Sequence, residues 1–197
     1  MSNSVKLATI FPDELNLNGD QANLLVLQQR LKFRGVKSEV ISITGNEDFL
    51  QFDFIFLGHG SLAAWSSVLV QRPSLFQDLK VAQAEGSFIF AVASGYQKLA
   101  SELGFAAASD QLPAHRSEFV DAGGVVGYVN TDSALQPVLF DDKGLMTLLH
   151  GPILAKNPEL ADELISKMSW ADTTVRTQKL DELDNLAALS RETAFEH

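Results

Sequence analysis

The chain has 197 residues, no cysteine and a formal net charge of −10, with 46% hydrophobic and 20% charged residues. This balance is typical of a globular protein, and the acidic charge argues against nucleic acid or an anionic membrane as a partner. Without cysteine the chain forms no disulfide, no thiolate metal site and no thiol nucleophile. The four histidines lack the spacing of a zinc site, so we expect no metal and no cofactor.

The chain shows no sign of membrane insertion or export. No apolar run approaches the roughly 18 residues of a membrane span, and the polar start MSNSVK is unlike a signal peptide. We therefore expect a cytoplasmic protein, folded as a single domain over residues 1–197. No Gly-x-x-x-x-Gly-Lys sequence is present, so the chain itself is not expected to bind ATP in that mode.

Strands and helices alternate in the first half of the sequence. Apolar runs predict strands at 5–11, 37–43, 52–58 and 88–93. Helices are predicted at 19–35, with Asp20 as its N-cap and Gly35 as its C-cap, and at 95–104. The order predicts an α/β fold with a mainly parallel central sheet flanked by helices. Functional groups are then expected at the carboxyl ends of the strands.

The second half is less regular. Residues 117–131 and 136–151 indicate short strands with Gly-rich or Asp-Lys-Gly turns, which predict an antiparallel extension of the sheet. Residues 157–168 predict a helix with Pro158 in its first turn. Residues 177–197 predict an acidic C-terminal helix with leucines every third residue. It either docks on the body of the domain or binds a partner.

Three stretches, at 15–36, 88–100 and 148–165, together resemble the class I glutamine amidotransferases of the cobyric-acid-synthase type. Within that family they are most similar to the small glutaminase subunits of lipid II isoglutaminyl synthase. The resemblance implies a flavodoxin-like α/β fold and hydrolysis of glutamine by a cysteine on a strand–helix turn, with a histidine as base. It also implies that a separate Mur-ligase-like, ATP-dependent synthetase consumes the ammonia.

The residues that match the family give a mixed picture. His150 in LLHGP corresponds to the catalytic histidine, and Gly58 and Gly60 in LGHGS to the Gly-rich loop near the substrate. Arg116 loosely matches an arginine that grips the substrate carboxylate, and Gln97 matches within the Gly-Tyr-Gln that follows the turn. The nucleophile position, however, is Ala93 in ASGYQ. His59 stands where glycine is usual, and GYVNTDSALQPV departs from the usual Gly-Phe-Glu-Asn-His.

Ser94 is the obvious substitute for the missing thiol. At a nucleophile turn, the residues two before and two after the apex must be small. Around Ala93 these are Ala91 and Gly95, whereas around Ser94 they are the bulky Val92 and Tyr96. The turn is therefore predicted to be built around Ala93, with Ser94 supplying a backbone N–H to the oxyanion position.

Three functions remain open from the sequence. The first is a catalytically inactive glutaminase-like subunit of a Mur-ligase-like partner in peptidoglycan precursor amidation. The second is a sensor that binds glutamine or a related amino acid without hydrolysing it. The third is a serine-dependent amidohydrolase that uses Ser94 and His150.

Overall fold

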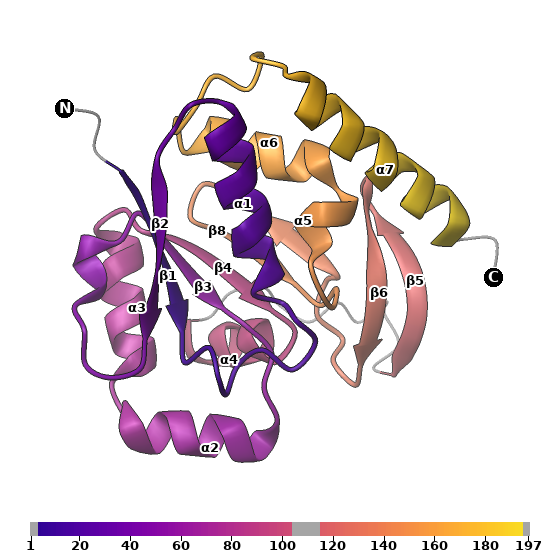
Figure 1. The fold of residues 1–197 in the computed structure, drawn as a ribbon. Helices are drawn as coiled ribbons and strands as arrows, with labels where there is room; N and C mark the ends of the chain where they lie inside the picture. Colours follow the sequence, from indigo (N-terminus) through magenta and orange to yellow (C-terminus); the bar gives the residue numbers. More distant parts are fainter. Residues whose placement is uncertain (1–3, 104–114, 195–197) are drawn as a thin grey trace.

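The computed structural model describes residues 4–103 and 115–194 (Figure 1). Its main sheet has six strands in the order β2-β1-β3-β4-β8-β7, and every neighbouring pair is parallel except β7 with β8. The strands are β1 (Val5–Ile10), β2 (Ser38–Ile43), β3 (Phe54–Leu57), β4 (Phe88–Val92), β8 (Gly144–Thr147) and β7 (Val138–Phe140). The mainly parallel α/β fold predicted from the sequence is confirmed.

Helices cover both faces of this sheet (Figure 1). On one face lie α1 (Ala22–Phe33), α5 (Ile153–Lys156) and α6 (Pro158–Lys167), with α7 (Gln178–Ala194) packed outside them. On the other lie α3 (Leu75–Ala84) and α4 (Ser94–Leu103). The remaining helix, α2 (Leu62–Gln71), lies beyond the carboxyl ends of the strands, and a single 3-10 turn, η1 (Phe49–Gln51), precedes β3.

The centre of the core is aromatic. Every residue of β3 and β4 is buried, as expected of strands covered on both faces. The ring of Phe54 stacks on Phe88 with 5.6 Å between centroids, and Phe56 meets Phe90 edge-on at 5.2 Å. Such pairs add about 0.5–1.5 kcal/mol each beyond the burial of their area. The strand that leads to Ala93 is therefore rigidly held.

The antiparallel part differs in one respect from the prediction. β7 extends the main sheet, as expected. The hairpin of β5 (Arg116–Ala122) and β6 (Val125–Thr131) instead forms a separate two-stranded sheet, with Gly123 and Gly124 at positive φ in its turn. A single bridge between Val129 and Leu149 joins this hairpin to the segment after β8. The hairpin therefore stands beside the main sheet and forms one wall of its carboxyl end.

The C-terminal helix is held largely by charge. The Arg30 guanidinium, only 3% exposed, forms two hydrogen bonds to Asp162 on α6 and a third to Asp184 on α7. Of the leucines that suggested docking, Leu180 is fully buried but Leu186 is 62% exposed. Within the described ranges, none of the helices combines the length and apolar character that a membrane span requires.

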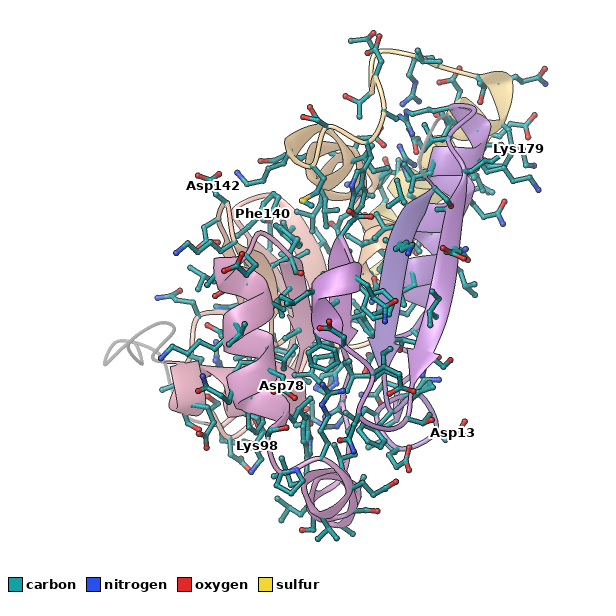
Figure 2. The ribbon with its side chains drawn as sticks, turned by 90° about the vertical axis from the view of Figure 1, so that its left-hand side faces the viewer. Asp13, Asp78, Lys98, Phe140, Asp142 and Lys179 are labelled. Atoms are coloured by element: carbon teal, nitrogen blue, oxygen red, sulfur yellow. The ribbon has the colours of Figure 1, made fainter. Side chains whose placement is uncertain are left out.

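The two ends of the sheet differ in character. In Figure 2 Asp13, in the loop after β1, lies near the lower end together with α2, whereas Asp142, in the turn before β8, lies at the upper end. The lower end is where the parallel strands terminate. The loops that carry Asp20, His59, Ala93 and His150 all leave the sheet there.

Candidate functional site

The turn after β4 is strained at Ala93. This residue has φ +48°, in the left-handed region that is unfavourable for a side chain bearing a Cβ. It is fixed from both sides, because its N–H donates to the Thr147 carbonyl at 2.7 Å and its carbonyl accepts from the Gln97 N–H at 3.0 Å. Gly95 must be glycine, since a Cβ there would lie 2.7 Å from the Leu57 carbonyl oxygen. The apex of the turn is thus Ala93, as the size of its neighbours predicts.

The Ser94 hydroxyl is engaged by partners other than His150. Its Oγ accepts hydrogen bonds from the Gly60 N–H at 3.0 Å and from the Trp65 Nε1–H at 2.7 Å. The hydroxyl also lies 2.9 Å from His59 Nδ1 and 3.0 Å from the Gly60 carbonyl oxygen, either of which can accept its proton. The side chain therefore fastens the start of α4 to the 58–60 loop and to α2.

The loop after β3 approaches the turn closely. A Cβ on Gly58 would lie 2.1 Å from the Leu15 carbonyl oxygen, and one on Gly60 would lie 2.5 Å from Leu15 Cδ2. Gly58 is thus required for packing against the loop after β1, whereas a side chain at position 60 would have to displace that of Leu15. Between them, His59 turns its ring towards the carboxyl end of β4, and its pKa is lowered to about 4 by burial and by the nearby His150.

His150 is held in a defined orientation. Its Nδ1 lies 2.6 Å from the Asn18 side-chain amide nitrogen, and its Nε2 lies 3.0 Å from the Asn130 carbonyl oxygen. Because an amide nitrogen only donates and a carbonyl only accepts, these contacts make Nδ1 the acceptor and Nε2 the donor. Both nitrogens are engaged, so in this arrangement the imidazole directs no lone pair at Ala93.

Asp20 and Asn23 join the loops of the site. Asp20 is fully buried and accepts from the Gly151 N–H at 2.8 Å and from the His59 N–H at 3.1 Å. The Asn23 side chain donates to the Gly151 carbonyl and accepts from the Leu154 N–H. Burial raises the Asp20 pKa, although these hydrogen bonds oppose the effect. Two of the stretches that carry the family resemblance therefore bind directly to each other.

The predicted helix cap at Asp20 is wrong. Helix α1 begins at Ala22 with Gln21 as its cap, and Gln21 makes no side-chain capping bond. The Asp20 carboxylate cannot cap the helix because both of its oxygens accept N–H groups from other loops. In the sequence, a carboxylate next to the start of a helix predicts an N-cap. The structure shows that the Asp20 carboxylate instead joins the loops that carry His59 and Gly151.

These groups surround a cavity of about 340 Å³ at the carboxyl end of β4. Its lining comes from five segments of the chain and comprises His59, Ala93, Ser94, Gln97, His115, Asn130, Thr131, Asp132, Leu148 and His150. The structure thus brings Gln97, Ala93 and His150 together around one cavity. Gln97 is oriented by a 2.8 Å hydrogen bond from its Nε2 to the Thr131 hydroxyl.

Arg116 is not part of this lining. It is 4% exposed, and its guanidinium donates to the Ser133 and Leu135 carbonyls at 2.8 Å. Its predicted contact with a substrate carboxylate therefore stays a prediction. Sequence reasoning missed Asn18, Trp65 and Asn130 as neighbours of the site. Trp65 gave no signal, whereas Asn130 lies in the segment GYVNTDSALQPV that departs from the family pattern.

A larger cavity of about 560 Å³ lies between α1 and α7, but its lining is mostly apolar and offers no arrangement for catalysis. Among the described residues, no three His, Asp or Glu side chains come close enough together to hold a metal ion. The cavity beside Ala93 is therefore the better candidate. It offers hydrogen-bonding groups, among them the Asp132 carboxylate, around a strained turn whose apex side chain is a methyl group.

Known proteins resemble this chain in sequence and in fold. The sequence is 27% identical to the GatD subunit of lipid II isoglutaminyl synthase (glutamine-hydrolyzing) from Staphylococcus aureus, over 79% of this chain and 80% of that protein. No model of a protein family matches the sequence.

Solved structures also resemble the fold. A glutamine amidotransferase superposes with a TM-score of 0.53 at 15% identity, over 82% of this chain and 98% of its own. A glutamine amidotransferase from Thermotoga maritima gives a TM-score of 0.48 at 10% identity, over 96% of each chain. The chain is thus similar in sequence to a GatD subunit, and its fold resembles that of a glutamine amidotransferase.

Proposed function

We propose that this chain is a catalytically inactive, glutaminase-like subunit. The observation that carries the proposal is the left-handed residue at the apex of the turn, which is an alanine with φ +48°. A methyl group cannot attack an amide, and removal of a nucleophile costs on the order of 10⁶-fold in turnover. The chain contains no cysteine elsewhere that could take its place.

The partner that we propose is a Mur-ligase-like, ATP-dependent synthetase acting on peptidoglycan precursors in the cytoplasm. Its support is the similarity to GatD, which by its name is a subunit of a glutamine-hydrolyzing synthase that acts on lipid II. The groups that shape the site are also intact, because Asp20 and Asn23 still hold the loops that carry His59 and His150. In this role the chain, folded as one domain, would stabilise or regulate the synthetase.

Two assays test this function. Purified chain incubated with glutamine should release no ammonia above the buffer control, with and without a Mur-ligase-like synthetase. Calorimetry should show binding between the chain and that synthetase. Ammonia release that disappears in Ser94→Ala would contradict inactivity, and the absence of binding to the synthetase would contradict the subunit role.

The sensor alternative rests on the cavity itself. Its lining offers donors and acceptors for an amide, such as Gln97 and Asn130. Among the described lining residues, however, no Lys or Arg is available for the carboxylate of a free amino acid, since Arg116 is turned towards 133–135. Calorimetric titration with glutamine decides the matter: saturable heat supports a sensor, and flat traces remove it.

The serine alternative has less support. In the combination expected from the sequence, Ser94 would be activated by His150. The structure instead places the Ser94 hydroxyl against His59, Gly60 and Trp65, while His150 binds Asn18 and Asn130.

A further inference from the structure

The His59 ring occupies the space beside the apex of the turn. Its Nδ1 accepts the backbone N–H of Ser94 at 3.4 Å and lies 2.9 Å from the Ser94 hydroxyl. Because Nδ1 accepts that N–H, it carries a lone pair, and the ring is in the neutral form with its proton on Nε2. A basic nitrogen thus faces the amide that follows Ala93.

That amide has a particular importance in acyl transfer. At a nucleophile turn, the N–H of the residue after the nucleophile stabilises the oxyanion, together with an N–H from another loop. Here the first of these donors is engaged by His59 Nδ1. In the neighbouring loop, the His59 N–H donates to Asp20 and the Gly60 N–H donates to the Ser94 hydroxyl. These three backbone N–H groups around the apex therefore already have acceptors within the protein and are not available to an oxyanion.

The ring is also held in place by its surroundings. It meets the His150 ring edge-on, with 5.1 Å between centroids and 76° between planes. The backbone of His59 is fixed on both sides, since its N–H binds Asp20 and its carbonyl accepts from the Leu17 N–H at 3.0 Å. Removing the ring would leave these backbone bonds intact.

We propose that His59 is a second block on glutamine hydrolysis: its imidazole fills the anion-stabilising position beside Ala93, so a thiol at position 93 alone does not restore the reaction. This inference rests on the proposed function, in which Ala93 marks the position of the lost nucleophile. It adds that two segments prevent hydrolysis: the turn at Ala93, which lacks the nucleophile, and the loop that carries His59.

The step at issue can be written for an Ala93→Cys variant. The thiolate sulfur bonds to the amide carbon of glutamine, and the carbonyl π pair moves onto oxygen. That oxygen needs the Ser94 N–H, which His59 occupies. When the carbonyl re-forms, ammonia leaves with a proton from the imidazolium of His150, which must first release one of its two partners to take up the thiol proton. Water then hydrolyses the thioester to glutamate and free thiol, and the atoms balance.

The test compares Ala93→Cys with the double variant Ala93→Cys, His59→Gly. Glutamate 5-semialdehyde, an aldehyde analogue of glutamine, adds to a thiol as a hemithioacetal whose oxygen occupies the oxyanion position. Because the natural chain has no cysteine, protection of the new thiol from iodoacetamide reports this adduct alone. Removing one oxyanion donor costs about 10²–10³-fold in other enzymes, so the double variant should bind the aldehyde about a hundredfold more tightly.

The controls separate the outcomes. Ala93→Cys combined with Leu62→Ala, a change of an 81% exposed side chain at the start of α2, should behave as Ala93→Cys alone. Equal aldehyde affinity of Ala93→Cys with and without His59→Gly overturns the His59 proposal and leaves Ala93 as the nucleophile position. No adduct in either variant, with a thiol that still reacts with iodoacetamide, overturns both assignments.

A second measurement uses the unaltered protein. Nitrogen-15 NMR of the imidazole at neutral pH should find His59 Nδ1 unprotonated and the Ser94 amide proton slow to exchange. A protonated Nδ1, or a Ser94 amide that exchanges as fast as those of exposed loops, contradicts the proposal whether or not the variants fold.

Discussion

Replacing Ser94 with alanine should destabilise the protein rather than remove an activity. The substitution deletes the one acceptor that serves both the Gly60 N–H and the Trp65 Nε1–H, at 3.0 and 2.7 Å. Trp65 is 2% exposed, so its indole N–H cannot turn to water. Each buried donor left without a partner costs about 1–3 kcal/mol.

The loss of stability in Ser94→Ala depends on how far water is excluded from the Gly60 N–H and the Trp65 indole N–H. Because Ser94 is only half-buried, one of them can recover water in part, and we expect a total loss of about 2–3 kcal/mol. For a chain of this length this corresponds to a melting temperature lower by roughly 4–12 °C. Urea unfolding followed by tryptophan fluorescence measures the free energy of unfolding directly.

Ser66→Ala on α2 is the matched control. Its hydroxyl binds the Leu62 carbonyl at an exposed position, so its loss should change the free energy of unfolding by less than about 0.5 kcal/mol. If Ser94→Ala is as stable as Ser66→Ala, the fastening role argued for Ser94 is refuted.

Three further predictions concern charged and titrating groups. Asp20→Asn should lower the free energy of unfolding by about 1–3 kcal/mol, because an amide NH2 would face one of the two backbone N–H groups; thermal unfolding measures it. Arg30→Ala should cost about 1.5–3 kcal/mol, because it removes three charge-assisted hydrogen bonds of a buried guanidinium although Asp162 keeps Arg34 and Asp184 keeps Arg176. Arg191→Ala, at a more exposed pair, should cost under about 1 kcal/mol; equal losses would refute the distinction. His59, with its pKa lowered to about 4, should stay neutral at pH 6 in an NMR titration, and its contribution to stability should be complete above pH 6.5 and decline as the pH falls towards 4; titration near 6.5 would contradict this.

Much of the fold could be predicted because its signals are local. The buried strand before Ala93 is a continuous apolar run, and small residues on both sides of the turn fixed its apex. The hairpin 116–131 was harder, because alternation and a Gly-Gly turn predict the pairing of its two strands but not whether they join a larger sheet.

From the sequence, a residue could be assigned to the candidate site only where it stands in a recognisable motif. Ala93 and His150 could be placed from their motifs, but the partners of Ser94 could not. Its bonds to Trp65 and Gly60 join segments about thirty residues apart, and their distance is set by the packing of α2 at the end of the sheet. Asp20 was misread for the same reason, since its partners lie 39 and 131 residues away.

The carboxylate of Asp20 has a consequence for what can change in this chain. It fixes the shape of the cavity through backbone amides, so that shape does not depend on the side chain at position 93. Architecture and chemistry are thereby uncoupled: the rim can keep its shape for recognition by another molecule whichever side chain stands at the apex.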